Sequence, residues 1–417
     1  MILYEIKQRF KGEKLTNIRE TVRREMEKNK RLAAMPEKSR IAVTAGSRGI
    51  QNIAAILREV VSYLKDKGFD PFLVAAMGSH GGATAEGQRE VLQQLGITEQ
   101  AVGAPILSSM ETIQLGTTPD QLPVYMDRHA YEADGIIVVN RVKAHTAFHG
   151  KVESGLSKMI TIGLGKQKGA SFVHSQGSQK MEHNIIAVSE YALKHAPIIM
   201  GLAIVENGYD ETSIIEGVAV EEWHQKEAAL LQKSKEFMPA LPITEIDVLV
   251  VEEMGKNYSG TGMDPNIIGR MRIDGFPEPA EPDIKKILVL DLSEESHGNA
   301  QGIGLADFTT DKLVQKIDRK ATYMNAITST FLKRAMIPLY YPTEQEALDA
   351  AMTSLGPDVK REEIRFIQIP NTLHLDRLYV SEKVLQQLEK QEANVQVIRE
   401  FELEFADGSL KHRLLNE

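Results

Sequence analysis

Two short apolar runs, each followed by a glycine-rich loop and then by a helical pattern, constrain the fold of this chain most strongly. The first run is residues 41–44, with Gly46-Ser47-Arg48-Gly49 directly after it. The second is residues 72–76, followed by Gly78-Ser79-His80-Gly81-Gly82 and a predicted helix over residues 84–95. This order is typical of an open α/β sheet, in which ligands bind at the carboxyl ends of the strands.

The same pattern recurs along the chain and predicts two α/β domains with Rossmann-like sheets flanking an interdomain cleft. Pro239 and Pro242 interrupt a stretch of weak periodicity, so we place a linker near residue 240. The expected N-terminal domain is 1–240, the second domain is 245–380, and residues 381–417 form a C-terminal segment that would pack back on the first domain.

Further elements follow from hydrophobic periodicity and from turn residues. The expected strands are 2–6, 135–140, 199–205, 246–251, 287–292 and 364–369. The expected helices are 323–335, 344–355 and 381–389. Residues 17–30 are expected to form a solvated helix or arm, because they are rich in charge and apolar residues are sparse there.

Composition narrows the chemistry and the compartment. The 417 residues include no cysteine, which excludes disulfides, zinc fingers, iron–sulfur clusters and thiolate catalysis from this chain's own side chains. The formal net charge of -9 argues against nucleic acid as a partner. The longest clean apolar run, 197–205, is far shorter than the roughly 20 residues that span a bilayer. Because the first residues also carry charges unlike a signal peptide, we expect a cytoplasmic protein with no membrane partner.

Histidines gather after predicted strands. His80, His145, His149 and His297 all lie in loops that directly follow strands. An imidazole at such a place can move a proton near neutral pH or bind a metal ion, and a solvated side chain is the plainer alternative. His145 and His149 are four residues apart, but the surrounding loop and the lack of a third local ligand argue against a metal site built on this pair alone.

Two lysines stand among small and apolar residues. Lys158 either has a depressed pKa and acts as a nucleophile or tether, or extends along the surface to reach water. Lys166 follows Gly163-Leu164-Gly165, but Gln167 stands where a phosphate-binding P-loop requires serine or threonine. The glycine loops at 46–49 and 78–82 are candidates for cradling one phosphate, or are tight turns.

These residues, in this order, resemble the lactate racemase family, whose members use a nickel-pincer nucleotide cofactor. The resemblance covers most of residues 40–300 and fades afterwards. It is carried by Ala45-Gly46-Ser47-Arg48, Gly78-Ser79-His80-Gly81-Gly82-Ala83-Thr84, Arg141-Val142-Lys143-Ala144-His145, Ser154-Gly155-Leu156-Ser157-Lys158, and His174 at the family's distance after that lysine. Asp264-Pro265-Asn266 and Glu295-Ser296-His297-Gly298 are similar to loops of the family's second domain.

The resemblance implies a role for each matched residue of the first domain. Lys158 would be tethered covalently to the cofactor, and His174 would be the protein's nickel ligand. Ser47 would also contact the cofactor. His80 and His145 would be acid/base residues on opposite faces of the substrate.

Substrate binding is assigned on the same resemblance. Arg48 would hold the substrate carboxylate through a bidentate pair. A family lysine of the second domain has no clear match, and Lys256, Arg270 and Arg272 are the alternatives for it. The expected substrate-binding residues are Arg48, Lys256, Asp264, Asn266 and Arg270.

The implied activity is that of an isomerase, a racemase or epimerase that inverts C2 of a 2-hydroxy acid by hydride transfer to and from the tethered cofactor. The motifs depart from the family at Ala45, Gly49, Gly81 and Leu156, where the family has aspartate, proline, arginine and glycine. Extra residues before Lys158 also make His149 a rival for the second base. We therefore expect a divergent subgroup whose substrate is lactate-like or a larger sugar acid.

Two other functions stay open at this point. One is a dehydrogenase or lyase that uses a freely exchanging nucleotide in the same cleft, although the G-x-G-x-x-G fingerprint is missing. The other is a non-catalytic cofactor-binding homologue. The expected partners are a small hydroxy-acid substrate and the cofactor-synthesis enzymes, with a homodimer as a further candidate.

Overall fold

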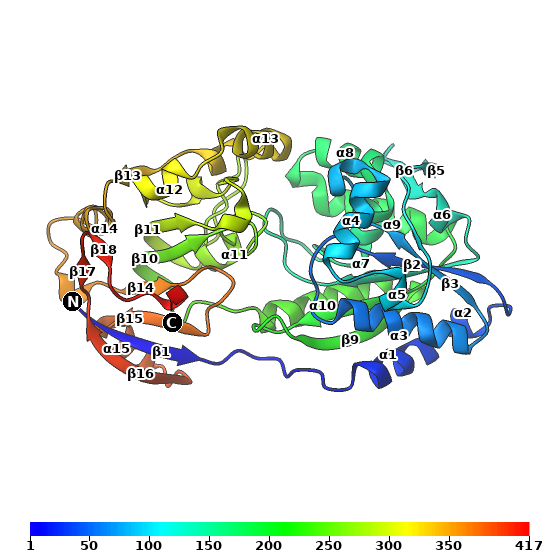
Figure 1. Cartoon of the computed structure of the whole chain (residues 1–417), viewed down its shortest axis with the longest axis horizontal. Helices are drawn as coiled ribbons and strands as arrows, with labels where there is room; N and C mark the ends of the chain where they lie inside the picture. Colours follow the sequence, from blue (N-terminus) through cyan, green and yellow to red (C-terminus); the bar gives the residue numbers. More distant parts are fainter. Residues whose placement is uncertain (417) are drawn as a thin grey trace. The chain divides into compact units, whose positions relative to one another are not determined.

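The computed structural model describes residues 1–416, which form two compact units (Figure 1). The central unit is Lys11–Met238. The terminal unit combines Met1–Phe10 with the residues from Pro239 onward. The border between the units lies beside the linker predicted near residue 240.

Strand pairing corrects the expected division at both ends of the chain. β1 (Ile2–Gln8) pairs antiparallel with β15 (Arg377–Ser381) and with β16 (Val395–Glu402), so the first ten residues belong to the terminal unit. Glu5 of β1 is buried, and Arg377 and Arg399 of these neighbours donate to its carboxylate at 2.8 and 2.7 Å. The residues after 381 belong to the same unit, because β16 is the edge strand beside β1.

The central unit contains a mostly parallel sheet with the strand order β4-β3-β2-β7-β8-β9. Only β9 runs antiparallel to its neighbour. The parallel strands are continuous apolar runs because core side chains cover both faces of the sheet. The strands are β2 (Arg40–Ala45), β3 (Asp70–Ala75), β4 (Ile106–Leu107), β7 (Gly135–Arg141), β8 (Ile198–Glu206) and β9 (Thr212–Ala219).

Helices supply the side chains on both faces. α3 (Ile53–Asp66) packs on one face, and α9 (Met181–His195) and α10 (Trp223–Phe237) contribute to the core on the other. The remaining elements are α1 (Ile18–Glu27), α2 (Lys30–Ala33), α4 (Ala85–Gln94), α5 (Glu99–Val102), β5 (Thr112–Thr117), β6 (Pro123–Asp127), α6 (Arg128–Tyr131), α7 (Leu156–Lys158) and α8 (Lys166–Ser175). Across residues 1–416, no helix combines the length and the apolar character that crossing a bilayer requires.

Helix α1 corrects the expectation of a solvated helix or arm over residues 17–30. Val22 and Met26 are 0% and 1% exposed and belong to the same core cluster as α3. These two residues are four positions apart, so one narrow apolar stripe is enough to bury a helix that is otherwise charged.

The terminal unit contains a mixed sheet with the order β13-β12-β11-β10-β14-β15-β1-β16. Its first five strands are parallel, and antiparallel pairing begins between β14 and β15. These strands are β10 (Glu245–Met254), β11 (Asp283–Leu292), β12 (Phe308–Thr310), β13 (Leu339–Tyr341) and β14 (Phe366–Ile369). The helices are α11 (Pro265–Ile268), α12 (Asp311–Gln315), α13 (Arg319–Ser329), α14 (Glu344–Thr353) and α15 (Glu382–Lys390).

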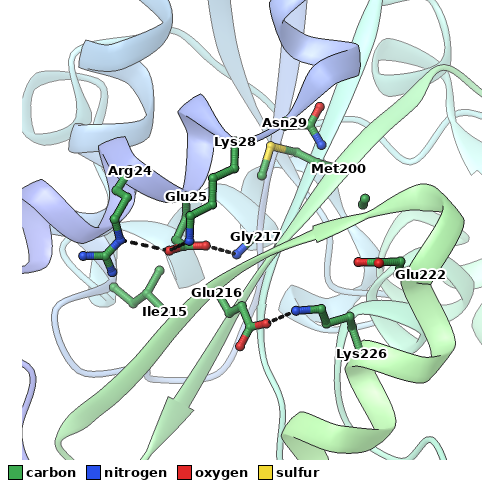
Figure 2. A pocket seen from close by; sticks show the side chains of 11 residues that line it. Arg24, Glu25, Lys28, Asn29, Met200, Ile215, Glu216, Gly217, Glu222 and Lys226 are labelled. Carbon is green, nitrogen blue, oxygen red and sulfur yellow. Dashed lines mark hydrogen bonds and ion pairs between the residues drawn. The ribbon is translucent and has the colours of Figure 1, made fainter.

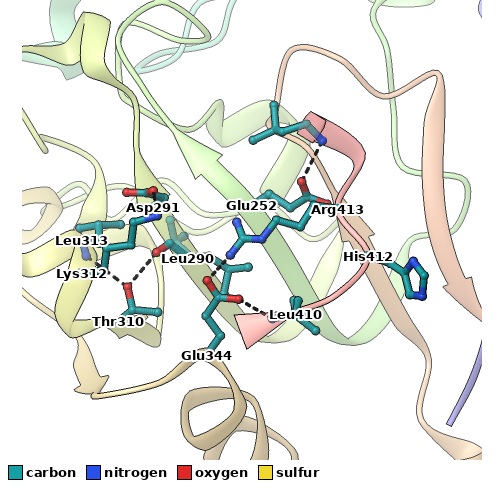
Figure 3. Close-up of polar contacts among 12 residues, drawn as sticks. Glu252, Leu290, Asp291, Thr310, Lys312, Leu313, Glu344, Leu410, His412 and Arg413 are labelled. Carbon is teal, nitrogen blue, oxygen red and sulfur yellow. Dashed lines mark hydrogen bonds and ion pairs between the residues drawn. The ribbon is translucent and has the colours of Figure 1, made fainter. Parts of the chain in front are cut away.

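The last residues of the described chain are held by buried carboxylates of the terminal unit (Figure 3). Glu252 of β10 accepts hydrogen bonds from the backbone N–H groups of Leu414 and Leu415 at 2.8 and 3.0 Å. Glu344 of α14 accepts from the N–H of Leu410 at 2.8 Å and pairs with Arg413. These bonds make the tail part of the folded unit, because they supply donors to oxygens of buried carboxylates.

Candidate active site

Three neighbouring strands of the central unit end at one edge of its sheet. β2 pairs in parallel with both β3 and β7, so their carboxyl ends share that edge. Ser47, which is half-buried, and Arg48 follow β2, His80 follows β3, and His145 follows β7. The fold thus gathers predicted site residues from distant parts of the sequence at the edge where open α/β sheets bind ligands.

The His80 loop is shaped by close packing on α4. Gly81 has a φ of +65°, and a Cβ there would lie 2.4 Å from the backbone carbon of Gly87, so a side chain does not fit. Nδ1 of His80 lies 2.8 Å from the carbonyl oxygen of Met77. Because a carbonyl only accepts, Nδ1 carries the proton of the neutral ring and Nε2 keeps its lone pair.

The charge state of His80 follows from its surroundings. Burial lowers its pKa, the Met77 carbonyl opposes this effect, and the charges of Arg48 and Lys158 lower the pKa further. His80 is therefore neutral at pH 7 and can accept a proton at Nε2.

His145 has the opposite tautomer. The N–H of Ala147 donates to its Nδ1 at 3.0 Å, so the proton of the neutral ring is on Nε2. Burial lowers the pKa of His145 well below its usual value, and the charges of Lys158 and His174 add to this effect. The backbone N–H of His145 donates to Glu153 at 2.6 Å, which fixes the loop that carries the ring.

His149 lies beside a buried carboxylate. Its Nδ1 is 3.5 Å from Oε2 of Glu153, and its side chain is 45% exposed. Glu153 also accepts from Lys235 at 2.7 Å and from the N–H of Gly150 at 3.2 Å. The charges of Lys158 and His174 act on His145, whereas the His149 ring contacts Glu153, and on this ground we expect His145 to be the second base.

Lys158 is the last residue of α7, and its amine is surrounded by positive charge. Its Nζ lies 3.5 Å from Oγ of Ser154. Burial and the charges of Arg48 and Lys143 lower its pKa to about 7, against the opposite effect of Glu153. The amine is therefore partly neutral, and hence nucleophilic, at physiological pH.

His174 lies near the end of α8, on the surface of the unit. Loss of water around its ring lowers its pKa, and the charges of Lys158 and His80 lower it further. The charges of Lys158 and His80 therefore act on the His174 ring. The imidazole is neutral at pH 7, which is the form that binds metal ions.

Arg48 completes this group. Its pKa is lowered by burial and by the charge of Arg141, and Arg141 itself pairs with Glu206. An anion bound beside Arg48 would relieve this repulsion. In the central unit, Lys158 lowers the pKa values of His80, His145 and His174, and Arg48 lowers those of His80 and Lys158, so electrostatic effects connect these five residues.

Two buried groups that support this site were missed from the sequence. The amine of Lys166 is fully buried and lies 3.1 Å from both Oδ2 of Asp127 and Oε1 of Gln88, so it is a structural cation. Glu227 of α10 is 1% exposed and accepts hydrogen bonds from Ser157, directly before Lys158. Neither partner could be found from spacing, because both contacts join residues far apart in the chain.

The second-domain candidates lie in the terminal unit, where each is bonded locally. Lys256 donates to the carbonyl oxygens of Gly260 and Gln301, both at 3.0 Å. Asp264 caps α11 and accepts from the backbone and side-chain nitrogens of Asn266 at 2.9 and 2.8 Å. These bonds fix both loops before any ligand arrives.

Arg270 differs from the expectation of a substrate-binding residue. Its guanidinium donates to the carbonyl oxygens of Leu305 at 3.1 Å and Ile284 at 2.8 Å, and pairs with Asp307 at 2.8 Å. Its side chain is 13% exposed. Because its donors join backbone segments of its own unit, Arg270 acts as a structural residue.

A separate polar pocket of about 530 Å³ lies on the central unit, lined by residues of α1, β9 and the start of α10 (Figure 2). Its cations are paired: Glu25 binds Arg24 at 3.2 Å and Lys28 at 2.7 Å, and Glu216 binds Lys226 at 2.5 Å. None of the predicted site residues lines this pocket. Its balanced charges contrast with the positive surroundings of Lys158.

Within residues 1–416, no group of three or more histidine, aspartate or glutamate side chains is placed to hold a metal ion.

Comparison with known proteins finds one matching family model. Residues 5–184 match the model of the lactate racemase N-terminal domain. Among curated proteins, none matches the chain in sequence.

Two solved structures are similar in fold. The lactate racemase apoprotein from Thermoanaerobacterium thermosaccharolyticum has 14% identity and a TM-score of 0.55, over 89% of this chain and 98% of that chain. A structural-genomics protein from Thermotoga maritima has 12% identity and a TM-score of 0.54, over 87% of this chain and 98% of that chain. At these identities the similarity establishes the α/β fold.

Proposed function

Because this chain belongs to the lactate racemase family, whose N-terminal domain its residues 5–184 carry, we propose that it is a racemase or epimerase of 2-hydroxy acids. The observation that supports this most strongly is the cluster of Arg48, His80, His145, Lys158 and His174 in the central unit. It contains an anion-binding cation, two acid/base groups, a nucleophilic amine and a metal ligand.

The residues present fit the nickel-pincer nucleotide. The amine of Lys158, with a pKa of about 7, has the neutral fraction that bond formation to a cofactor requires. His174 offers one neutral imidazole for nickel, and the sulfur donors would belong to the cofactor, because the chain has no cysteine. When bound, this cofactor supplies a hydride acceptor.

His80 and His145 would act on the hydroxyl group of the substrate. A C2–H of a 2-hydroxy acid is weakly acidic, so loss of the hydroxyl proton together with a hydride is an easier route to the planar keto acid. Nε2 of His80, which carries no proton because Nδ1 donates to Met77, would accept the hydroxyl proton as the C2–H bond breaks. When the C2–H bond forms again on the other face, the proton held by His80 would return to the oxygen, and Nε2–H of the neutral His145 ring would donate a hydrogen bond to that oxygen.

Arg48 would position the substrate carboxylate. Its planar guanidinium can form two parallel hydrogen bonds to a carboxylate, which fixes both distance and orientation. Binding would be favoured by the repulsion from Arg141, which an anion relieves. The proposed substrate class is thus an anionic 2-hydroxy acid, lactate-like or a sugar acid.

A stereochemical screen in heavy water tests this function. Protein made together with the cofactor-synthesis enzymes is incubated with single enantiomers or epimers of 2-hydroxy acids and sugar acids. We expect inversion of one of them with little deuterium at C2, because the hydride that leaves is the hydride that returns. Inversion with full deuterium exchange at C2 would mean proton abstraction, and no inversion across the panel would contradict the proposed activity.

A further inference from the structure

A buried carboxylate of α10 meets the start of the helix that carries Lys158. Both oxygens of Glu227 lie 3.1 Å from the backbone nitrogen of Ser157, which donates to them. The hydroxyl of Ser157 also donates to Glu227. The indole N–H of Trp223, one helical turn earlier on α10, donates to the same hydroxyl oxygen at 3.2 Å.

The same contact explains a glycine of the motif. A Cβ on Gly155 would lie 2.1 Å from Oε1 of Glu227. The φ of Gly155 is 179°, which any residue can adopt, so the requirement is for space and not for backbone freedom. Gly155 and Ser157 are therefore matched to a carboxylate that lies 70 residues further along the chain.

We propose that Glu227 is a positioning residue, whose carboxylate fixes the start of α7 and thereby the place of the Lys158 amine beside Arg48 and Lys143. This proposal rests on the proposed role of Lys158 as the cofactor attachment point. α7 continues into the π-helical segment Met159–Leu164, but the N–H groups at its start have no preceding helical carbonyl oxygen as acceptor, and Glu227 supplies acceptors for them.

Glu227 acts on the position of Lys158 through its hydrogen bonds to Ser157, and not through its charge. The charges that act on Lys158 are those of Arg48, Lys143 and Glu153. A glutamine at 227 keeps a carbonyl oxygen for the Ser157 N–H and an amide that can donate to its hydroxyl oxygen. The Lys158 amine should therefore keep its position in Glu227→Gln and lose it in Glu227→Ala.

Labelling of the apoprotein tests this directly. The rate at which acetic anhydride acetylates Lys158 is measured from pH 5 to 10 by peptide mass spectrometry and normalised to Lys168, an exposed lysine of α8. Wild type and Glu227→Gln should share a midpoint near pH 7. In Glu227→Ala the midpoint should rise by about one pH unit, and labelling at pH 7 should fall about fivefold relative to wild type.

Controls separate positioning from folding. Glu236→Ala changes an exposed glutamate of the same helix and should leave the midpoint unchanged. Ser157→Ala removes one bond of the same group and should raise the midpoint less than Glu227→Ala, so it tests the idea even where Glu227→Ala does not fold. If Glu227→Ala folds and its labelling midpoint is unchanged, the proposal is overturned, whatever the change in melting temperature. If Glu227→Ala does not fold, an unchanged midpoint in Ser157→Ala overturns it.

The outcome is independent of the proposed function. A midpoint shift in the apoprotein, with no cofactor mass ever found on Lys158, would refute the attachment role and leave Glu227 as a positioning residue. A cofactor mass on Lys158 with no midpoint shift would refute only the role of Glu227.

Discussion

The amine of Lys166 lies 3.1 Å from the side-chain oxygen of Gln88, and both side chains are fully buried. The amide nitrogen of Gln88 in turn donates to the carbonyl oxygens of Gly78 at 2.9 Å and His80 at 3.3 Å. Lys166 begins α8, the helix that carries His174. One buried pair therefore joins the loop of a proposed acid/base residue to the helix of the proposed nickel ligand.

Lys166→Met should destabilise the protein strongly. It removes the partner of Asp127, which is 0% exposed, and leaves that carboxylate buried without its cation. We expect a loss of about 3–5 kcal/mol in the free energy of unfolding, measured by urea titration. Lys168→Met, two residues away and exposed, should change it by less than about 0.5 kcal/mol. Equal effects of the two substitutions would contradict the structural role of Lys166.

His80→Ala and His145→Ala should each abolish most turnover while the cofactor stays bound. General acid/base groups typically contribute about 10²–10⁴-fold to a rate, so kcat should fall by that order. Mass spectrometry of the intact protein checks that the cofactor is retained. His149→Ala should keep most of the activity, because Lys158 and His174 act on His145, whereas His149 contacts Glu153. A His149 variant as inactive as the His145 variant would reverse the assignment of the second base.

Arg48→Lys should weaken discrimination for the carboxylate. Lysine keeps the charge but cannot form two parallel hydrogen bonds, so kcat/KM for the acid should fall about 10- to 100-fold. The ratio of kcat/KM for the acid to that for its amide should fall as well. If the ratio is the same in both proteins, Arg48 does not bind the carboxylate.

Glu227 should make stability depend on pH. Burial raises its pKa to about 7 from 4.5, against the opposing hydrogen bonds from Ser157. Between pH 4.5 and 7 the folded state therefore binds more protons than the unfolded state. The contribution of Glu227 to the free energy of unfolding is present below pH 4.5 and is lost as pH rises through 7.

Glu227→Gln removes this titration, so the difference between wild type and this variant isolates the effect of Glu227 on stability. The free energy of unfolding of wild type minus that of the variant should fall by up to about 3 kcal/mol between pH 4.5 and 7.5. Urea titrations at several pH values measure this difference. A difference that does not change with pH would show that Glu227 is ionised throughout this range.

The sequence predicts those parts of the fold that depend on local pattern. The continuous apolar runs at 41–44 and 135–140 become β2 and β7 because both faces of their sheet are covered. Thr84, the expected start of a helix, caps α4, since its hydroxyl accepts from the N–H of Gly87 at 3.0 Å. Such signals lie within a few residues of the structure they specify.

Long-range partners explain what was missed. β1 joins the terminal unit because of its pairing with β15 and β16, which no local pattern reveals. Glu227 and Gln88 look like ordinary helix residues until the fold brings them against Ser157 and Lys166. The site loops could be located from strand ends, whereas the buried groups that hold them could not.

The most direct test of this account is the mass of the peptide that contains Lys158. The protein is produced together with the cofactor-synthesis enzymes, digested and analysed by mass spectrometry, with nickel measured in the intact protein. We predict a nucleotide adduct on Lys158 and one nickel per chain, with nickel lost in His174→Ala. An unmodified Lys158 and no bound nickel under these conditions would contradict the proposed cofactor and the function built on it.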